Sequence, residues 1–253
     1  MDTITKYKIR SSDVSYLSKE QVKFISEHSE LFLSVDDSKL CENCEYLYFD
    51  SAQNRENRFK FHSVDHGDLF FDFKEQIDYH RKKNYSLSKE PLAKALGLTV
   101  KRDRIVWDVT CGTAKDALLI YSFGAKVVAF ERHPIIYFLL LDAKEHFPVN
   151  IHFIYGDSSQ INLTQLSRPD TIYYDPMYPE KKKSALPRKE MQIFKEIVGP
   201  DTDSESYLEF ARTIALDRVV VKRSLQAPQI KADINAVYEG KTTRYDMYKI
   251  FSK

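Results

Sequence analysis

The sequence is poor in glycine, in cysteine and in long apolar stretches. Only seven of its 253 residues are glycine, about 3% where ~7% is usual, so we expect each glycine where the backbone requires one. Three cysteines cannot all pair, which indicates a reducing compartment rather than a disulfide scaffold. No window reaches the ~18 consecutive apolar residues of a membrane-spanning helix, and the first residues lack the character of a signal peptide. We therefore expect a cytoplasmic protein with no membrane contact.

The charges of the chain are nearly balanced. There are 38 Lys and Arg residues against 37 Asp and Glu, and 43% of the residues are hydrophobic. This composition is that of a globular protein and excludes a disordered chain. The net charge of +1 does not exclude a nucleic-acid partner, because a total charge does not describe local patches.

The pattern of the sequence changes near residue 85. Before it, Ser18 and Gln21 have the spacing of a capping box and open an amphipathic stretch in which Val22, Ile25 and Phe32 are expected to face inward. Alternating segments follow at residues 46–50, 58–64 and 68–73. We expect a small α+β subdomain over residues 1–84 and a second domain over residues 85–253.

The second domain alternates strands with helices. The expected strands are residues 105–109, 126–131, 151–155, 171–175 and 218–222. The expected helices are residues 88–96, capped by Ser88, then 115–123, 134–147, 189–198 and 205–215. Short apolar strands between helices predict an α/β fold with a mostly parallel sheet covered on both faces. Ligands of such sheets bind at the carboxyl ends of the strands.

An acidic residue stands at each of the first four of these strand ends. Asp108 is followed by a turn at Gly112 that leads into a helix, and such a turn brings backbone N–H groups close to a ligand. Glu131 follows Asp108 by 131 − 108 = 23 positions, which suits hydrogen bonding to a ribose diol. Asp157 with Ser158, and then Asp175, complete the rim. The turn lacks the second glycine of the dinucleotide fingerprint, so dinucleotide binding is not favoured.

The segment Asp175-Pro176-Met177-Tyr178-Pro179 is the most specific motif. Its two prolines hold a rigid, extended turn that fixes a carboxylate, peptide carbonyls and an aromatic ring at the sheet edge. This assembly suits a planar base with an exocyclic amine: Tyr178 would stack on the base, while Asp175 and the Pro176 carbonyl would accept the amine hydrogens. The alternative is a structural loop in which Tyr178 packs into the core.

These motifs resemble the ribosomal RNA small subunit methyltransferase J family over about two-thirds of the chain, from about Asp78 to the C-terminus. Residues 1–75 carry no such match. The segments that carry the resemblance are Asp108-x-Thr-x-Gly112, Lys115-Asp116-Ala117, Glu131-Arg132-x-Pro134, Asp175–Pro179, Lys183–Leu186, Lys189–Met191, Val198–Asp201, Val219–Arg223 and Arg244–Tyr248. The family usually has glycine and arginine where this chain has Ala114 and Lys115.

The resemblance implies a Rossmann-like class I methyltransferase fold and S-adenosylmethionine as cofactor. It also implies methyl transfer to the exocyclic N2 of a guanine in small-subunit (16S) ribosomal RNA, as naked RNA or as the 30S particle. The expected catalytic residues are Asp175, Pro176 and Tyr178. The expected cofactor-binding residues are Asp108, Gly112, Lys115, Asp116, Glu131, Arg132, Asp157, Ser158 and Asp175.

Basic residues that could hold RNA cluster after the Asp-Pro motif and at one strand end. The expected RNA-binding residues are Lys181, Lys182, Lys183, Arg188, Lys189, Lys222 and Arg223. The run of residues 80–83 adds to this supply, whereas we interpret residues 101–104 as a solvated face. Two other functions remain open: methylation of another amine, such as adenine N6 or a protein side chain, and RNA binding without catalysis on a methyltransferase scaffold.

Cys41 and Cys44 form a C-x-x-C pair that His62 and His66 could complete as a metal site. No second pair with zinc-finger spacing is present, so reduced thiols are favoured and no metal is expected. Cys111 has no evident base partner in the sequence, so we assign it no nucleophilic role.

Overall fold

The structure is a computed structural model that describes residues 7–40, 43–51, 57–160, 162, 164–177, 189–199 and 204–251. The chain divides into two compact units. Unit 1 comprises Met1–Phe73, His133–Val149 and Lys181–Gly199, and unit 2 comprises Lys74–Arg132, Asn150–Glu180 and Pro200–Lys253. None of the helices in the described ranges is long and apolar enough to cross a bilayer.

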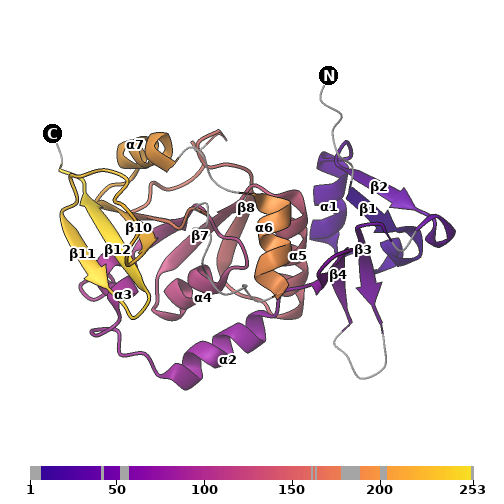
Figure 1. Ribbon diagram of the computed structural model, residues 1–253, viewed down its shortest axis with the longest axis horizontal. Coiled ribbons are helices and arrows are strands. Elements are labelled where there is room, and N and C mark those ends of the chain that lie inside the picture. Colours follow the sequence, from indigo (N-terminus) through magenta and orange to yellow (C-terminus); the bar gives the residue numbers. More distant parts are fainter. Residues whose placement is uncertain are drawn as a thin grey trace. The chain divides into compact units, whose positions relative to one another are not determined.

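Unit 1 is built on a five-stranded mixed sheet with the order β2-β1-β3-β4-β5 (Figure 1). Its strands are β1 (Tyr7–Arg10), β2 (Phe32–Val35), β3 (Tyr46–Asp50), β4 (Arg58–Ser63) and β5 (Gly67–Leu69). β1 pairs in parallel with β2 and β3, and the other pairs are antiparallel. Its helices are α1 (Lys19–Glu27), α5 (Pro134–His146) and α6 (Lys189–Val198), with 3-10 turns at Ser11–Tyr16 and Asp37–Lys39.

The start of α1 confirms the predicted capping box. The Ser18 hydroxyl accepts the Gln21 N–H at 3.2 Å, and the Gln21 side-chain oxygen accepts the Ser18 N–H at 2.9 Å. The predicted inward face is wrong for Val22, which is 51% exposed, because the buried stripe of the helix runs through Gln21 and Phe24 instead.

The core of unit 1 joins its sheet to α5. Phe59 on β4 meets Phe138 of α5 edge to face, with ring centroids 5.2 Å apart. The Asp142 carboxylate of α5 accepts the Phe59 backbone N–H at 3.1 Å. Asp142 is 5% exposed, and burial raises its pKa to about 7. A side chain of α5 therefore satisfies a backbone donor of the sheet at the cost of a buried carboxyl group.

Unit 2 is built on a seven-stranded sheet with the order β11-β12-β10-β9-β6-β7-β8. Its strands are β6 (Ile105–Asp108), β7 (Lys126–Glu131), β8 (Ile151–Tyr155), β9 (Thr171–Tyr174), β10 (Arg218–Ser224), β11 (Ala236–Glu239) and β12 (Thr243–Lys249). The five strands from β8 to β10 are parallel, and β12 runs antiparallel to β10 and β11. Its helices are α2 (Phe73–Lys83), α3 (Pro91–Leu96), α4 (Lys115–Ser122) and α7 (Ser204–Ile214).

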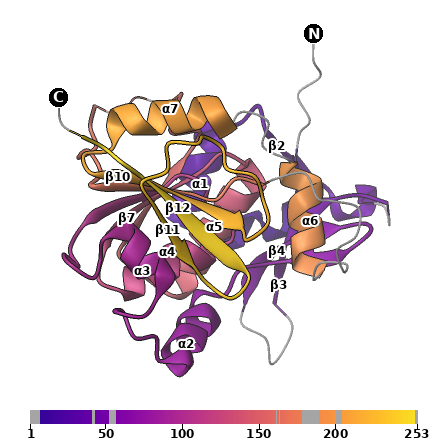
Figure 2. The same ribbon diagram turned by 60° about the vertical axis from the view of Figure 1, so that its left-hand side comes forward.

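The helices of unit 2 cover both faces of this sheet, with α7 on one side and α3 and α4 on the other (Figure 2). Under α7, the buried side chains of Trp107, Tyr174 and Val221 pack against Leu208 and Ala211. This apolar layer contributes about 25 cal/mol per Å² of buried surface and fixes the strands whose ends carry the acids. The predicted doubly covered, mostly parallel sheet is confirmed.

β6 is the point at which the chain changes direction across the sheet: β7 and β8 follow on one side of β6, and the chain then crosses to β9 on the other side. In open α/β sheets the crevice at such a reversal is where ligands bind. Here the reversal brings the ends of β6 and β9, with Asp108 and Asp175, next to each other.

Three local expectations differ from the structure. The N-cap of α3 is Glu90 rather than Ser88, since Pro91 occupies the first turn of this helix. The α2 helix and the β11–β12 hairpin were not predicted. β11 has only four residues, and β12 carries Arg244 and Asp246, which are buried as an ion pair, so neither strand shows the apolar pattern of a buried strand.

Candidate active site

The turn after β6 has the conformation expected of a ligand-binding loop. Gly112 and Ala114 both have positive φ, at +54° and +61°. At Ala114 this left-handed conformation costs roughly 1–2 kcal/mol for a residue with a Cβ, at the position where the resembled family usually has glycine. The Cys111 N–H donates to the Phe130 carbonyl at 3.0 Å and ties the turn to β7. The turn delivers the chain into α4, which begins at Lys115.

Glu131, at the end of β7, accepts hydrogen bonds from the segments that follow β6 and β8. Its Oε2 atom accepts the Gly112 N–H at 2.9 Å, and its backbone carbonyl accepts the Gly156 N–H at 2.8 Å. The side chain is 6% exposed. A carboxylate held against a glycine turn at the end of the second strand is the group that binds ribose hydroxyls in nucleotide sites of this topology. The residues present therefore fit a ligand that carries a ribose.

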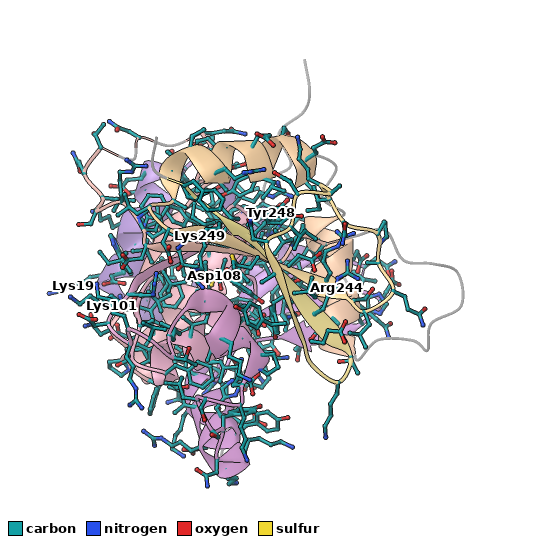
Figure 3. The ribbon with its side chains drawn as sticks, turned by 90° about the vertical axis from the view of Figure 1, so that its left-hand side faces the viewer. Lys19, Lys101, Asp108, Arg244, Tyr248 and Lys249 are labelled. Carbon is teal, nitrogen blue, oxygen red and sulfur yellow. The ribbon has the colours of Figure 1, made fainter. Side chains whose placement is uncertain are left out.

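Asp175 is anchored through its backbone to the turn. Its N–H donates to the Thr110 hydroxyl at 2.7 Å, and the Thr110 N–H donates to Asp108 Oδ1 at 3.2 Å. Asp108 is 1% exposed and lies in the interior, whereas Lys101 projects outward (Figure 3). Burial, and after it the charge of Asp116, hold the pKa of Asp108 well above the usual range.

Lys222 lies between two carboxylates. Its ammonium group is 2.8 Å from Asp116 Oδ2 and 2.9 Å from Asp175 Oδ2. The hydroxyl of Tyr173 also donates to Asp116 Oδ2, at 2.5 Å. Burial lowers the pKa of Lys222, but the two carboxylates outweigh burial and raise it. Burial likewise opposes ionisation of Asp116, and the Lys222 charge reverses that effect, so the pKa of Asp116 is lowered.

Asp157 and Ser158 stand at the end of β8 with partners of their own. Asp157 Oδ1 accepts the backbone N–H and the hydroxyl of Ser159, at 2.8 and 2.7 Å. Ser158 is 1% exposed and shares a hydrogen bond with the Tyr207 hydroxyl of α7. Ser158 therefore holds α7 to the end of β8, and Asp157 is half-buried there.

The remaining expected site residues divide into three groups. Lys115 and Arg132 are exposed at the rim, and Pro176 is buried. Tyr178, Lys181, Lys182, Lys183 and Arg188 lie outside the described residues, as does the side chain of Lys189.

Lys222 and Arg223, two of the expected RNA-binding residues, both have partners within the protein. Lys222 is engaged by Asp116 and Asp175. Arg223 is 4% exposed, and its guanidinium donates to the Pro228 carbonyl. The two residues are neighbours on β10, so their side chains lie on opposite faces of the sheet, and each has partners within the protein. We do not propose phosphate contacts for either residue.

Sequence reasoning missed Thr110 and Tyr173 as parts of the site. Thr110 follows the strand-end acid by two positions, and Tyr173 occupies the strand position that pairs with Asp108. The apolar appearance of the β9 sequence concealed Tyr173, whose hydroxyl reaches the neighbouring helix.

The possible metal site of the C-x-x-C pair with His62 and His66 is not assembled in the part of the chain that the structure describes. His62 pairs with Asp68 at 3.0 Å and His66 with Glu196 at 3.6 Å. Cys41 lies outside the described residues. Cys44 takes part in a disulfide, so the expectation of reduced thiols is wrong for this residue. Cys111 is a free thiol whose pKa burial raises, which keeps it an unreactive thiol.

Comparisons with known proteins agree with this architecture. A family model described as "Putative SAM-dependent methyltransferase" matches residues 42–250. The crystal structure of a SAM-dependent methyltransferase from Neisseria gonorrhoeae superposes with a TM-score of 0.70, at 26% identity, and covers 98% of this chain and 97% of that one. The fold, the switch-point site and these matches define the chain as an S-adenosylmethionine-dependent methyltransferase with a class I, Rossmann-like fold.

Curated relatives narrow the class. The ribosomal RNA small subunit methyltransferase J of Pseudoalteromonas translucida is 36% identical over 193 residues, 72% of this chain and 77% of that protein. The protein of the same name from Bdellovibrio bacteriovorus is 40% identical over 190 residues, 72% of this chain and 74% of that protein. The chain belongs to the ribosomal RNA small subunit methyltransferase J family.

Proposed function

We propose that this protein transfers a methyl group from S-adenosylmethionine to the exocyclic N2 of a guanine in small-subunit ribosomal RNA, in the cytoplasm. The observation that carries the proposal is the Asp175 carboxylate. It stands at the switch-point crevice, next to the glycine turn, and its side chain is 36% exposed. Pro176 follows it and fixes the direction of the chain.

The residues around the turn suit the cofactor. When bound, S-adenosylmethionine supplies an activated methyl group on a sulfonium, so the protein needs no covalent intermediate. Glu131 would accept hydrogen bonds from the ribose, and the half-buried Asp157 would border the adenine. The acidic side chains of the crevice favour a cationic ligand. These residues hold and orient the methyl donor, and none of them needs to form or break a covalent bond.

Asp175 and the Pro176 carbonyl would bind the acceptor amine. The lone pair of a guanine N2 is delocalised into the ring, so the free amine is a poor nucleophile. Hydrogen bonds from its two N–H groups to these oxygens favour a pyramidal nitrogen aimed at the methyl group. As the N–C bond forms and the S–C bond breaks, the nitrogen loses one proton, which the solvent-bordering Asp175 can pass to water. Orientation of this kind contributes about 7–11 kcal/mol in well-positioned reactions.

We propose that Tyr178 stacks on the target base and that residues 181–189 contact RNA phosphates, as the sequence motif implies. In unit 2, the C-terminal turn of α2 offers a further cationic surface. Arg81, Lys82 and Lys83 are exposed, and the Lys83 ammonium lies 5.3 Å from the ring centroid of Tyr79, which is 54% exposed. The same helix contacts the cofactor turn, because Gln76 Nε2 donates to the Thr113 carbonyl at 3.4 Å. Cations and an exposed ring beside the site suit an RNA strand.

The function is tested with purified protein, radiolabelled S-adenosylmethionine and RNA from a strain that lacks the gene. We expect methylation of small-subunit RNA at guanine N2, located by mass spectrometry of nuclease fragments. Naked RNA, 30S particles and DNA are compared as substrates. Label on adenine, on protein or on DNA instead would refute the proposed acceptor, and binding of RNA with no transfer at all would indicate a non-catalytic protein.

The role of Asp175 is tested with the Asp175→Ala variant. We expect a loss of methyl transfer that is much larger than the loss of cofactor affinity, because the amine loses its acceptor while Glu131 and the turn still hold the cofactor. Asp217→Ala is a matched control, since Asp217 is an acid that directly precedes β10, at the end of the strand opposite to Lys222. Near-normal turnover of Asp175→Ala would contradict the proposed role.

A further inference from the structure

Lys222 is held in the site by the register of the sheet. β9 and β10 are parallel neighbours in which Val221 pairs with Tyr174. The next residue on each strand is Lys222 on one side and Asp175 on the other, so the two side chains emerge together at the carboxyl end of the sheet. The ammonium then reaches Asp175 Oδ2 at 2.9 Å and Asp116 Oδ2 at 2.8 Å.

The Asp175 carboxylate is consequently held at two points. The Thr110 hydroxyl accepts its backbone N–H at 2.7 Å, and Lys222 binds one of its carboxylate oxygens. The first contact fixes the main chain before Pro176, and the second fixes the rotation of the side chain. A carboxylate restrained in this way presents a constant direction to a group that enters the crevice.

The charge of the cluster also fits the reaction. Lys222 with Asp116 and Asp175 carries two negative charges and one positive charge, which leaves a net charge of −1 beside the proposed site of a cationic methyl donor. The ammonium side chain is 24% exposed and is enclosed by acids, so it is not placed to attract phosphate. Its partners account for its presence without any contact to RNA.

We propose that Lys222 is a positioning residue for methyl transfer: its ammonium group holds the Asp175 carboxylate in the orientation that receives the acceptor amine. This inference rests on the proposed role of Asp175. Lys222 does not touch the reacting atoms and acts through Asp175. Asp116 accepts a hydrogen bond from the ammonium group on the other side, and the Tyr173 hydroxyl donates to Asp116 and holds that carboxylate in place.

The principal test compares Lys222→Met with Lys222→Arg and with Lys249→Met. Lys249 is a matched control, because it also pairs with an acid, Asp217, and lies at the other end of the β10–β12 pair. For Lys222→Met we expect kcat to fall by about 10²-fold, as for a misplaced catalytic group, while the affinity for the cationic S-adenosylmethionine is retained or raised, because the cluster becomes more negative. Lys222→Arg should recover part of kcat, and Lys249→Met should equal the wild type.

The pH profile separates positioning from a purely structural role. The titratable groups that face the cluster are Asp108 on β6, Asp116 on α4, His80 on α2, Tyr173 on β9 and Tyr245 on β12. Loss of the ammonium leaves two facing carboxylates without their counter-charge. The acid side of the pH dependence of kcat should therefore move to higher pH by about 1–3 units in Lys222→Met. In Lys222→Arg it should lie close to its position in the wild type. An unshifted pH dependence with kcat within about threefold of the wild type would overturn the proposal.

Two further measurements keep the test decisive. If Lys222→Met does not fold, the double variant Lys222→Met/Asp116→Asn restores the net charge of −1. It should fold and show a lower kcat than the single variant Asp116→Asn, whereas an equal kcat in these two variants would overturn the proposal. Carboxyl ¹³C NMR of the free protein reports on the cluster without any substrate: the titration of Asp116 should move to higher pH in Lys222→Met, and an unchanged titration would refute the contact between Lys222 and Asp116. Wild-type protein that methylates no guanine would refute the proposed function instead.

Discussion

The carboxylate of Glu131 has two separable duties, one in the fold and one in the proposed cofactor site. Within the fold it accepts the buried Gly112 N–H at 2.9 Å. In Glu131→Ala this donor loses its acceptor, which costs about 1–3 kcal/mol of stability. At about 2–4 °C per kcal/mol for a protein of this size, the melting temperature should fall by several degrees.

The cost to cofactor binding is larger. Two ribose hydroxyls that donate to a carboxylate contribute about 1.5–3 kcal/mol each, so the alanine variant should lose about 3–6 kcal/mol of binding free energy. That loss corresponds to a Kd for S-adenosylmethionine that is about 10²–10⁴-fold higher.

Glu131→Gln separates the two duties. Its amide oxygen can still accept the Gly112 N–H, so the melting temperature should stay close to that of the wild type. Its bonds to the ribose become neutral ones of about 0.5–1.5 kcal/mol each, and the Kd should rise by about 10–10²-fold. Titration calorimetry and thermal unfolding measure both effects, with Glu239→Gln on the exposed end of β11 as a control. A Kd for Glu131→Ala within twofold of the wild type would refute this role.

Two further predictions concern unit 1 and α2. The pKa of Asp142 is raised from 3.8 to about 7, so the folded state binds this proton more tightly than the unfolded state. The free energy of unfolding should therefore decrease by about 4 kcal/mol as the pH rises from about 4 to about 7. Urea unfolding of Asp142→Asn, which keeps an acceptor for the Phe59 N–H, should lack this loss; an equal pH dependence in both proteins would contradict the assignment. Alanine at Arg81, Lys82 and Lys83 should weaken RNA binding and reduce its logarithmic salt slope by about 0.7–0.9 for each phosphate that is no longer bound, whereas alanine at the exposed Lys101 and Arg102 should not; an unchanged slope would exclude α2 as an RNA surface.

The sequence was most informative where local pattern decides structure. The strands β7 and β8 and the helix α6 have the predicted bounds, because an apolar run between polar residues needs only its own neighbours to be recognised. The position of the Asp-Pro motif and of the strand-end acids was predictable from the alternation of strands and helices, since parallel strands place their carboxyl ends at one edge of the sheet. Prediction was weakest in residues 1–84, where the pairing of β1 with β2 and β3 joins segments that are distant in sequence.

The sequence by itself therefore determined the α/β class, the order of the strand-end acids and the family resemblance. Only the tertiary structure decided which charges neutralise one another. Lys222 and Arg223 appear in the sequence as a basic pair at a strand end, and nothing local distinguishes them from a surface patch. The register of β9 with β10 sets Lys222 between Asp116 and Asp175, and Arg223 becomes buried. Such contacts join residues 47 and 106 positions apart, so they depend on chain topology, which a local pattern does not contain.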